Sequence, residues 1–161
     1  MQSQSSRPVD WVEEVVNRQE DKLFRTAIVI MKNKEDAEDI LHDVFIKLIE
    51  KAPQFESIEH ETAWLVRVTV NLCKSRLRLH WRKKSAPLLD TYPAKSDEQQ
   101  DITQAVLALP PNYRVAINLF YYHGYSTREI AEITERKEST IRKDLTRARR
   151  LLKDFLEGED I

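Results

Sequence analysis

Glycine is nearly absent from this chain, and that scarcity restricts the fold more than any other feature of the sequence. Only two glycines, Gly124 and Gly158, occur among 161 residues. Hairpin turns and phosphate-binding loops depend on glycine, because it reaches backbone conformations that other residues avoid. The sequence therefore predicts an all-α fold, in which helices are joined by short turns.

The composition is that of a soluble globular protein, with 33% charged and 41% hydrophobic residues, and the length allows two small domains. The single cysteine, Cys73, cannot form an intramolecular disulfide, so we expect a buried apolar residue in a reducing cytoplasm. The longest wholly apolar runs, such as residues 27–31, are far shorter than the roughly 20 residues that span a bilayer. No membrane insertion is predicted.

Three helical patterns predict a first domain over residues 8–84, a bundle of three or four helices. The first pattern runs from about Trp11 to Met31. The second begins near Lys34 and ends before Pro53, and its apolar residues recur three and four apart as one buried stripe. The third runs from Thr62, whose hydroxyl can cap a helix, to about Trp81.

Residues 85–101 contain two prolines and no sustained helical stripe, which predicts an interdomain linker. Helical patterns resume over residues 102–157, where we expect a second domain. Its helices are expected over Ile102–Leu109, from Pro111 to before Gly124, after Ser126, and over about Ser139–Leu156. Ser126 and Glu129 have the spacing of a capping box, in which each side chain accepts from the other residue's backbone N–H.

The sequence lacks the motifs of catalysis: it has no phosphate-binding loop, no His-Glu-x-x-His and no nucleophile elbow. The four histidines, His42, His60, His80 and His123, are widely separated. We therefore predict no enzyme, no metal site, no cofactor and no small-molecule substrate.

Acidic residues cluster at the start of the second helix, although the formal net charge of the chain is only -1. Glu35, Asp39 and Asp43 are spaced four apart and share one helix face. This face is either a solvated surface with acids near a helix N-terminus or a docking surface for a basic partner.

Basic residues gather in two places, and both indicate contact with nucleic acid. From Lys74 to Lys84 no acid occurs, and Trp81 lies within the run, which offers charge for phosphates and a ring for stacking on an unpaired base. The capped helix after Ser126, a brief turn and the long basic helix predict a helix-turn-helix, whose second helix enters the major groove. The alternatives are a solvated basic helix end and an ordinary helical hairpin.

Five segments resemble the extracytoplasmic-function sigma factors, in that family's order and spacing. Residues 36–45 resemble the helix that docks on RNA polymerase, and 63–78 the promoter-melting and minus-ten helix. Residues 107–114 and 124–131 resemble the opening of region four, and 140–149 its minus-35 recognition helix. The resemblance implies two helical domains that lend promoter recognition to core RNA polymerase, with an anti-sigma factor as regulator.

The resemblance also implies residue roles. The candidates for docking on polymerase are Asp39, His42, Asp43 and Lys47. Those for minus-ten DNA are Glu59, His60, Glu61, Arg67, Asn71, Lys74, Arg78, Trp81 and Arg82. Those for minus-35 DNA are Thr127, Arg128, Thr140, Arg142, Lys143, Thr146, Arg147 and Arg150. Helical spacing by itself already predicts that Arg142, Lys143, Thr146 and Arg150 lie near one exposed strip.

Five residues depart from the family's pattern. Glu135 and Arg136 replace the usual glycine and apolar residue of the turn, which predicts a different turn geometry or strain at a left-handed residue. Lys137 replaces a small hydroxyl residue that caps the recognition helix, and His42 replaces a glutamine. Asp144 stands where a basic residue is usual, so we expect it to repel a nearby phosphate.

Two other functions compete with the sigma factor. One is a stand-alone helix-turn-helix regulator, although the sequence offers no spare amphipathic helix for the dimerisation that such proteins use. The other is an interaction protein whose DNA-binding surfaces have been lost, as the residues of the turn and Asp144 suggest.

Overall fold

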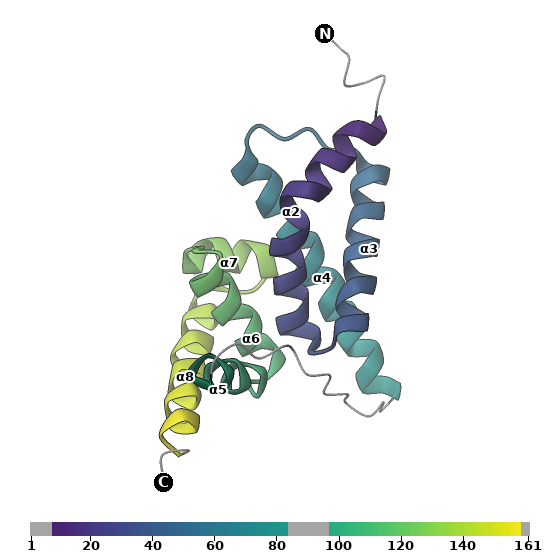
Figure 1. Cartoon of the computed structure of the whole chain (residues 1–161). Coiled ribbons are helices and arrows are strands. Elements are labelled where there is room, and N and C mark those ends of the chain that lie inside the picture. Colours follow the sequence, from purple (N-terminus) through teal and green to yellow (C-terminus); the bar gives the residue numbers. More distant parts are fainter. Residues whose placement is uncertain (1–7, 84–96, 159–161) are drawn as a thin grey trace.

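The computed structural model describes residues 8–83 and 97–158, and within those ranges every element is helical. Helices α2 (Pro8–Met31), α3 (Lys34–Lys51) and α4 (Ile58–Lys83) lie side by side as one bundle (Figure 1). The remaining elements form a second group: α5 (Asp97–Leu107), α6 (Pro111–Ile117), the π-helical turn η1 (Asn118–Tyr122), α7 (Thr127–Thr134) and α8 (Glu138–Gly158). The predicted all-α fold is confirmed.

The first bundle is built on the apolar stripe that the sequence predicts for α3. Its buried members are Ala37, Ile40, Val44 and Leu48. They share one hydrophobic core with fully buried side chains of α2 and α4, such as Leu23 and Leu65. Cys73 is completely buried, and this burial raises the pKa of its thiol, so it behaves as the small apolar residue expected.

The second group packs its helices around α8. Ile141, Leu145 and Ala148 form the buried face of that helix, which lies against α6 and α7. The predicted capping box at the start of α7 is present: the Glu129 N–H donates to Ser126 Oγ at 3.1 Å, and the Ser126 N–H donates to Glu129 Oε1 at 2.8 Å.

Two predicted boundaries are wrong. Helix α4 begins at Ile58, before Thr62, because Ser57 supplies the cap: its Oγ accepts from the His60 N–H at 3.1 Å. The Thr62 hydroxyl instead accepts from Gln19 Nε2 at 2.9 Å. Helix α5 begins at Asp97, inside the stretch predicted as linker, and the remainder of that stretch, residues 85–96, lies outside the described residues.

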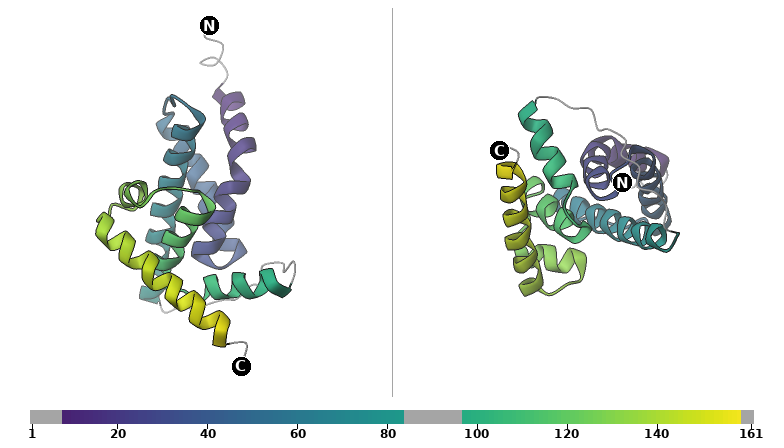
Figure 2. Two further views of the ribbon diagram at one scale, coloured as in Figure 1. Left: turned by 90° about the vertical axis from the view of Figure 1, so that its left-hand side faces the viewer. Right: turned by 90° about the horizontal axis from the view of Figure 1, so that it is seen from below.

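The two helical groups are packed against each other (Figure 2), and one arginine of α6 joins them. The Arg114 side chain is almost completely buried. Its Nε donates to the Val29 carbonyl at 2.8 Å and its Nη2 to the Ile30 carbonyl at 2.6 Å, both in the last turn of α2. Its Nη1 donates to the Leu109 carbonyl. The final carbonyls of a helix lack partners within the helix, so this guanidinium satisfies them.

Candidate nucleic-acid and polymerase interfaces

Helix α8 presents most of the predicted minus-35 residues on one exposed strip, opposite its buried face. The strip consists of Arg142, Lys143, Thr146, Arg147 and Arg150. Thr140, at the start of the helix, is half-buried. In α7, Arg128 is exposed, whereas Thr127 is half-buried and its hydroxyl donates to Glu138 Oε2 at 2.7 Å. The same oxygen accepts from Arg142 Nη1 at 3.0 Å, so Glu138 links both helices of the helix-turn-helix.

The turn between α7 and α8 adopts the strained form that the sequence allows. Glu135 lies in the left-handed region, with φ 58° and ψ 42°, where a side chain costs roughly 1–2 kcal/mol. The N–H groups of Glu135 and Arg136 both donate to the Ala131 carbonyl, the second at 3.0 Å. The helix therefore ends as it would with glycine, but at an energetic cost.

Asp144 lies on the buried face of α8 and not in the exposed strip, so it is not placed to repel a phosphate there, contrary to expectation. Its side chain is 8% exposed, and its Oδ2 accepts from Arg136 Nη1 at 2.6 Å. Both residues depart from the family pattern, and the structure shows that they bond to each other.

The acidic face of α3 is exposed, but a cation lies at its edge. The Asp39 and Asp43 side chains are 64% and 48% exposed, and His42 and Lys47 are exposed as well. Arg76 of α4 lies 3.6 Å from Asp39 and 3.7 Å from Asp43. These N–O distances are longer than those of a hydrogen-bonded ion pair, and both carboxylates are exposed to water. We therefore expect Arg76 to bind them weakly, so that basic groups of a partner can take its place.

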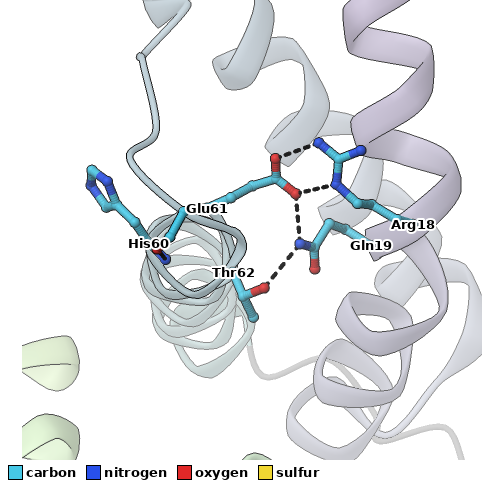
Figure 3. Close-up of polar contacts among 6 residues, drawn as sticks. Arg18, Gln19, His60, Glu61 and Thr62 are labelled. Atoms are coloured by element: carbon cyan, nitrogen blue, oxygen red, sulfur yellow. Dashed lines mark hydrogen bonds and ion pairs between the residues drawn. The ribbon is translucent and has the colours of Figure 1, made fainter.

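The predicted minus-ten residues divide between outward and inward positions. Glu59, His60, Asn71 and Arg78 are exposed. Glu61 points the other way: its carboxylate accepts from Arg18 Nε at 2.8 Å, from Arg18 Nη2 at 2.7 Å and from Gln19 Nε2 at 2.7 Å (Figure 3). Figure 3 also shows that His60, its neighbour, points away from these groups.

Arg18, Gln19 and Glu61, together called the Glu61 cluster, join the start of α4 to α2. Burial alone raises the pKa of this carboxyl, but the hydrogen bonds from Arg18 and Gln19 and the charge of Arg18 outweigh it, and the pKa falls below its usual value. The carboxylate is thus ionised, 4% exposed and fully engaged, and it has no free edge for a base. Sequence reasoning missed Arg18 and Gln19, because nothing local marks residues that meet Glu61 from another helix.

Two further minus-ten candidates are in contact with the helix-turn-helix. Arg67 Nη2 donates to the Glu132 carbonyl at 2.7 Å, and Lys74 Nζ donates to the Thr134 carbonyl at 3.5 Å, both at the end of α7. Burial lowers the pKa of Lys74, and the nearby charges of Arg136 and Arg78 lower it further. Part of the basic face of α4 is therefore covered by α7. The side chains of Trp81 and Arg82 lie outside the described residues.

Neither a metal-binding cluster nor a membrane-spanning helix occurs in the part of the chain that the structure describes. No group of three or more His, Cys, Asp or Glu side chains there could hold a metal ion. No helix there is both long enough and apolar enough to cross a bilayer.

Comparison with known families matches both halves of the chain in order. The model of Sigma-70 region 2 matches residues 15–83, and that of Sigma-70, region 4 matches residues 99–152. The ECF RNA polymerase sigma factor SigM of Mycobacterium tuberculosis is 30% identical over 149 residues, covering 89% of this chain and 76% of the relative. SigE of Mycolicibacterium smegmatis is 29% identical over 157 residues, and the match covers 89% of this chain but only 61% of SigE.

Solved structures show the same fold. The sigma factor RpoE from Bartonella quintana, in complex with the anti-sigma factor NepR, superposes with a TM-score of 0.77 at 25% identity, covering 92% of this chain and 97% of that one. CnrH, in complex with the cytosolic domain of CnrY, gives 0.65 at 21% identity, covering 91% and 88%.

The helical bundle and the helix-turn-helix thus define a sigma factor, the class of protein that directs RNA polymerase to promoters at transcription initiation. Within that class, the chain belongs to the ECF RNA polymerase sigma factors.

Proposed function

We propose that this chain binds core RNA polymerase through α3, captures an unpaired minus-ten base at the start of α4 and reads minus-35 DNA with α8. The observation that carries the proposal is the exposed strip of α8, where five basic or hydroxyl side chains stand together while Asp144 is turned inward. Basic and hydroxyl groups at helical spacing suit the phosphates and base edges of a major groove. The chain brings no catalytic group of its own.

Polymerase docking is assigned to the exposed face of α3 that carries Asp39, His42, Asp43 and Lys47. The match to region 2 as well as region 4 favours this function over a stand-alone helix-turn-helix regulator. A carboxylate pair that Arg76 neutralises only weakly remains attractive to a basic surface.

Minus-ten capture is assigned to the exposed residues Glu59, His60, Asn71 and Arg78, and Glu61 is left out because its carboxylate is buried. Extruding a base from the stack costs a few kcal/mol, which polar groups at the pocket must offset. To contact DNA, Arg67 and Lys74 must first give up their hydrogen bonds to carbonyls of α7.

Each of the two helical groups is assigned its own binding partners. Residues 8–84 serve polymerase and the minus-ten element, and residues 102–157 serve the minus-35 element. The connecting segment, 85–101, is effectively shorter, since α5 begins at Asp97. We also infer an anti-sigma factor as a partner, because the solved relatives named above are complexes, one with the anti-sigma factor NepR and one with a domain of CnrY.

Transcription in vitro tests the proposal. Core RNA polymerase and the full chain are combined on a library of random promoters, and initiation at defined sequences is expected when both proteins are present. Asp39→Lys combined with Asp43→Lys should weaken the complex with core polymerase by about tenfold or more, through like-charge repulsion. Glu13→Lys, an exposed acid on α2, is the matched control and should leave the complex intact.

The opposite outcomes are equally clear. Absence of both specific initiation and a stable core complex would refute the proposed function. Tight, sequence-specific DNA binding by the chain alone, unchanged by core polymerase, would instead support the stand-alone regulator.

A further inference from the structure

The ion pair between Arg136 and Asp144 lies where α7 meets α8, at the turn of residues 135–137, which we call the corner of the helix-turn-helix. Arg136 belongs to the turn, and Asp144 lies in the second turn of α8, so the 2.6 Å contact between Nη1 and Oδ2 ties the turn to the body of the helix. The two side chains are 24% and 8% exposed. A charge-assisted hydrogen bond shielded in this way is short and directional, and salt screens it less than it screens a surface ion pair.

The position of Asp144 on α8 couples its contact with Arg136 to the rotation of the whole helix. Counted at 100° per residue, Asp144 shares an arc with Ile141, Leu145 and Ala148, the buried face of the helix. Arg142, Lys143 and Thr146 fall on the remaining arc and are exposed. A rotation of α8 that moved Asp144 away from Arg136 would therefore turn the exposed strip by the same angle.

The turn itself gives little resistance to such a rotation. Glu135 holds a left-handed conformation that disfavours a side chain, so the local backbone preference does not stabilise this geometry. The contacts across the corner must do so instead: Arg136 with Asp144 on one side, and Thr127 with Glu138 on the other. The Thr127–Glu138 contact involves side chains that are more exposed than Asp144.

We propose that Asp144 is a positioning residue, which acts through Arg136 to set the rotation of α8 and hence which bases of the minus-35 element the exposed strip selects. The inference rests on the proposed function of α8, since it concerns how that helix is oriented for DNA. Asp144 itself touches no DNA. It determines where Arg142, Lys143 and Thr146 are directed, and a small misplacement of such groups is enough to lose a directional base contact.

The test uses holoenzyme made from core polymerase and the full chain, on promoters that share one minus-ten element and carry randomised minus-35 elements. The quantity measured is minus-35 selectivity, the ratio of initiation from the preferred element to initiation from a scrambled one. Asp144→Asn keeps the shape of the side chain and removes its charge, and we expect selectivity to fall about tenfold. Binding to core polymerase should not change.

Two further variants separate orientation from stability. The exchanged pair, Arg136→Asp with Asp144→Arg, should recover part of the selectivity that Asp144→Asn loses, because the ion pair is restored with reversed polarity. Leu152→Ala removes a partly buried contact of the same helix and lowers stability without touching the corner. It should leave selectivity unchanged at temperatures well below its unfolding midpoint.

The results distinguish the two proposals. If the parent chain shows no minus-35 selectivity, the proposed role of α8 fails, and this inference fails with it. If the parent chain is selective and Asp144→Asn is equally selective, only the positioning role is overturned. It is also overturned if Leu152→Ala loses as much selectivity as Asp144→Asn, because the effect then reflects stability. Should Asp144→Asn not fold, Arg136→Gln removes the same pair from the more exposed side, with the same expected loss.

Discussion

Arg114 and Ile30 lie in different helical groups, yet the Arg114 Nη2 donates to the Ile30 carbonyl oxygen at 2.6 Å. The same guanidinium reaches the Val29 and Leu109 carbonyls, so a single side chain satisfies the end of α2 and the segment before α6. Burial lowers the pKa of Arg114 to about 10, which still leaves it charged at neutral pH. The interface between the two groups is therefore fixed by a buried cation on helix carbonyls.

Arg114→Met is expected to destabilise the folded chain by about 2–4 kcal/mol, because buried carbonyls lose a charged donor while the apolar volume is retained. Urea unfolding followed by circular dichroism measures this loss. Arg128→Met removes an exposed arginine of the same group and should change the free energy of unfolding by less than about 0.5 kcal/mol. Equal effects of the two substitutions would contradict the role given to Arg114.

The contrast between Arg114 and α3 shows how far sequence carries the fold. The stripe Ala37, Ile40, Val44 and Leu48 repeats at helical spacing, so its burial follows from the pattern alone. The capping box of Ser126 and Glu129 is equally local. Arg114 reaches residues more than 80 positions away, and no periodicity in its own segment identifies such partners.

The candidate sites show the same limit. The exposed strip of α8 was predictable, because helical spacing assigns each residue to a face. Glu61 and Asp144 were predicted to face DNA or its phosphates, and both are buried. In each case the deciding factor is an arginine from another element, Arg18 or Arg136, whose position depends on tertiary packing.

Substitution of Glu61 is expected to lower the stability of the fold and to leave recognition of the minus-ten base intact. Glu61→Gln removes the charge that Arg18 and Gln19 bind, and it leaves Arg18 without its bidentate partner. We expect a loss of about 2–3 kcal/mol at pH 7, measured by urea unfolding. Because the pKa of Glu61 is lowered in the folded state, its contribution is present above the ordinary pKa and is lost as pH falls through the folded value.

A neighbouring residue supplies the control for this substitution. Glu59→Gln changes an exposed carboxylate of the same helix turn and should leave the free energy of unfolding nearly unchanged. In holoenzyme at a temperature where both variants are folded, minus-ten selectivity should respond to Glu59→Gln and not to Glu61→Gln. The reverse pattern would show that Glu61 turns outward to meet DNA.

His123 makes the stability of the folded chain depend on pH. Its Nε2 lies 2.7 Å from Thr26 Oγ1, and the Thr26 hydroxyl donates to the Lys22 carbonyl at 3.1 Å. Burial, aided by the charge of Lys22, lowers the pKa of His123 from 6.5 to about 4.

The sign of the effect follows from proton binding. Between pH 6.5 and about 4 the unfolded chain binds the His123 proton and the folded chain does not, so the free energy of unfolding falls as the pH drops through this window. Over the whole window the loss is on the order of 3 kcal/mol, and about 2 kcal/mol of it falls between pH 6.5 and 5. Urea titrations at pH 7.5, 6 and 5 should show it, and His123→Gln should flatten the slope. A slope unaffected by His123→Gln would assign the effect to other groups.

The exposed strip of α8 gives the most direct prediction about promoter recognition. If Arg142 or Lys143 reads a base, its substitution by alanine should weaken minus-35 binding by roughly 1–3 kcal/mol and relax selectivity. If the residue contacts a phosphate instead, the slope of log binding constant against log salt concentration should become shallower by about 1. The loss should be smaller for Arg142, because this residue must first leave Glu138, 3.0 Å away. Lys153→Ala, exposed near the far end of the helix, is the control and should change neither quantity. Binding of the holoenzyme to minus-35 variants at several salt concentrations measures both selectivity and salt dependence. If neither Arg142→Ala nor Lys143→Ala has an effect, α8 contacts DNA through another face.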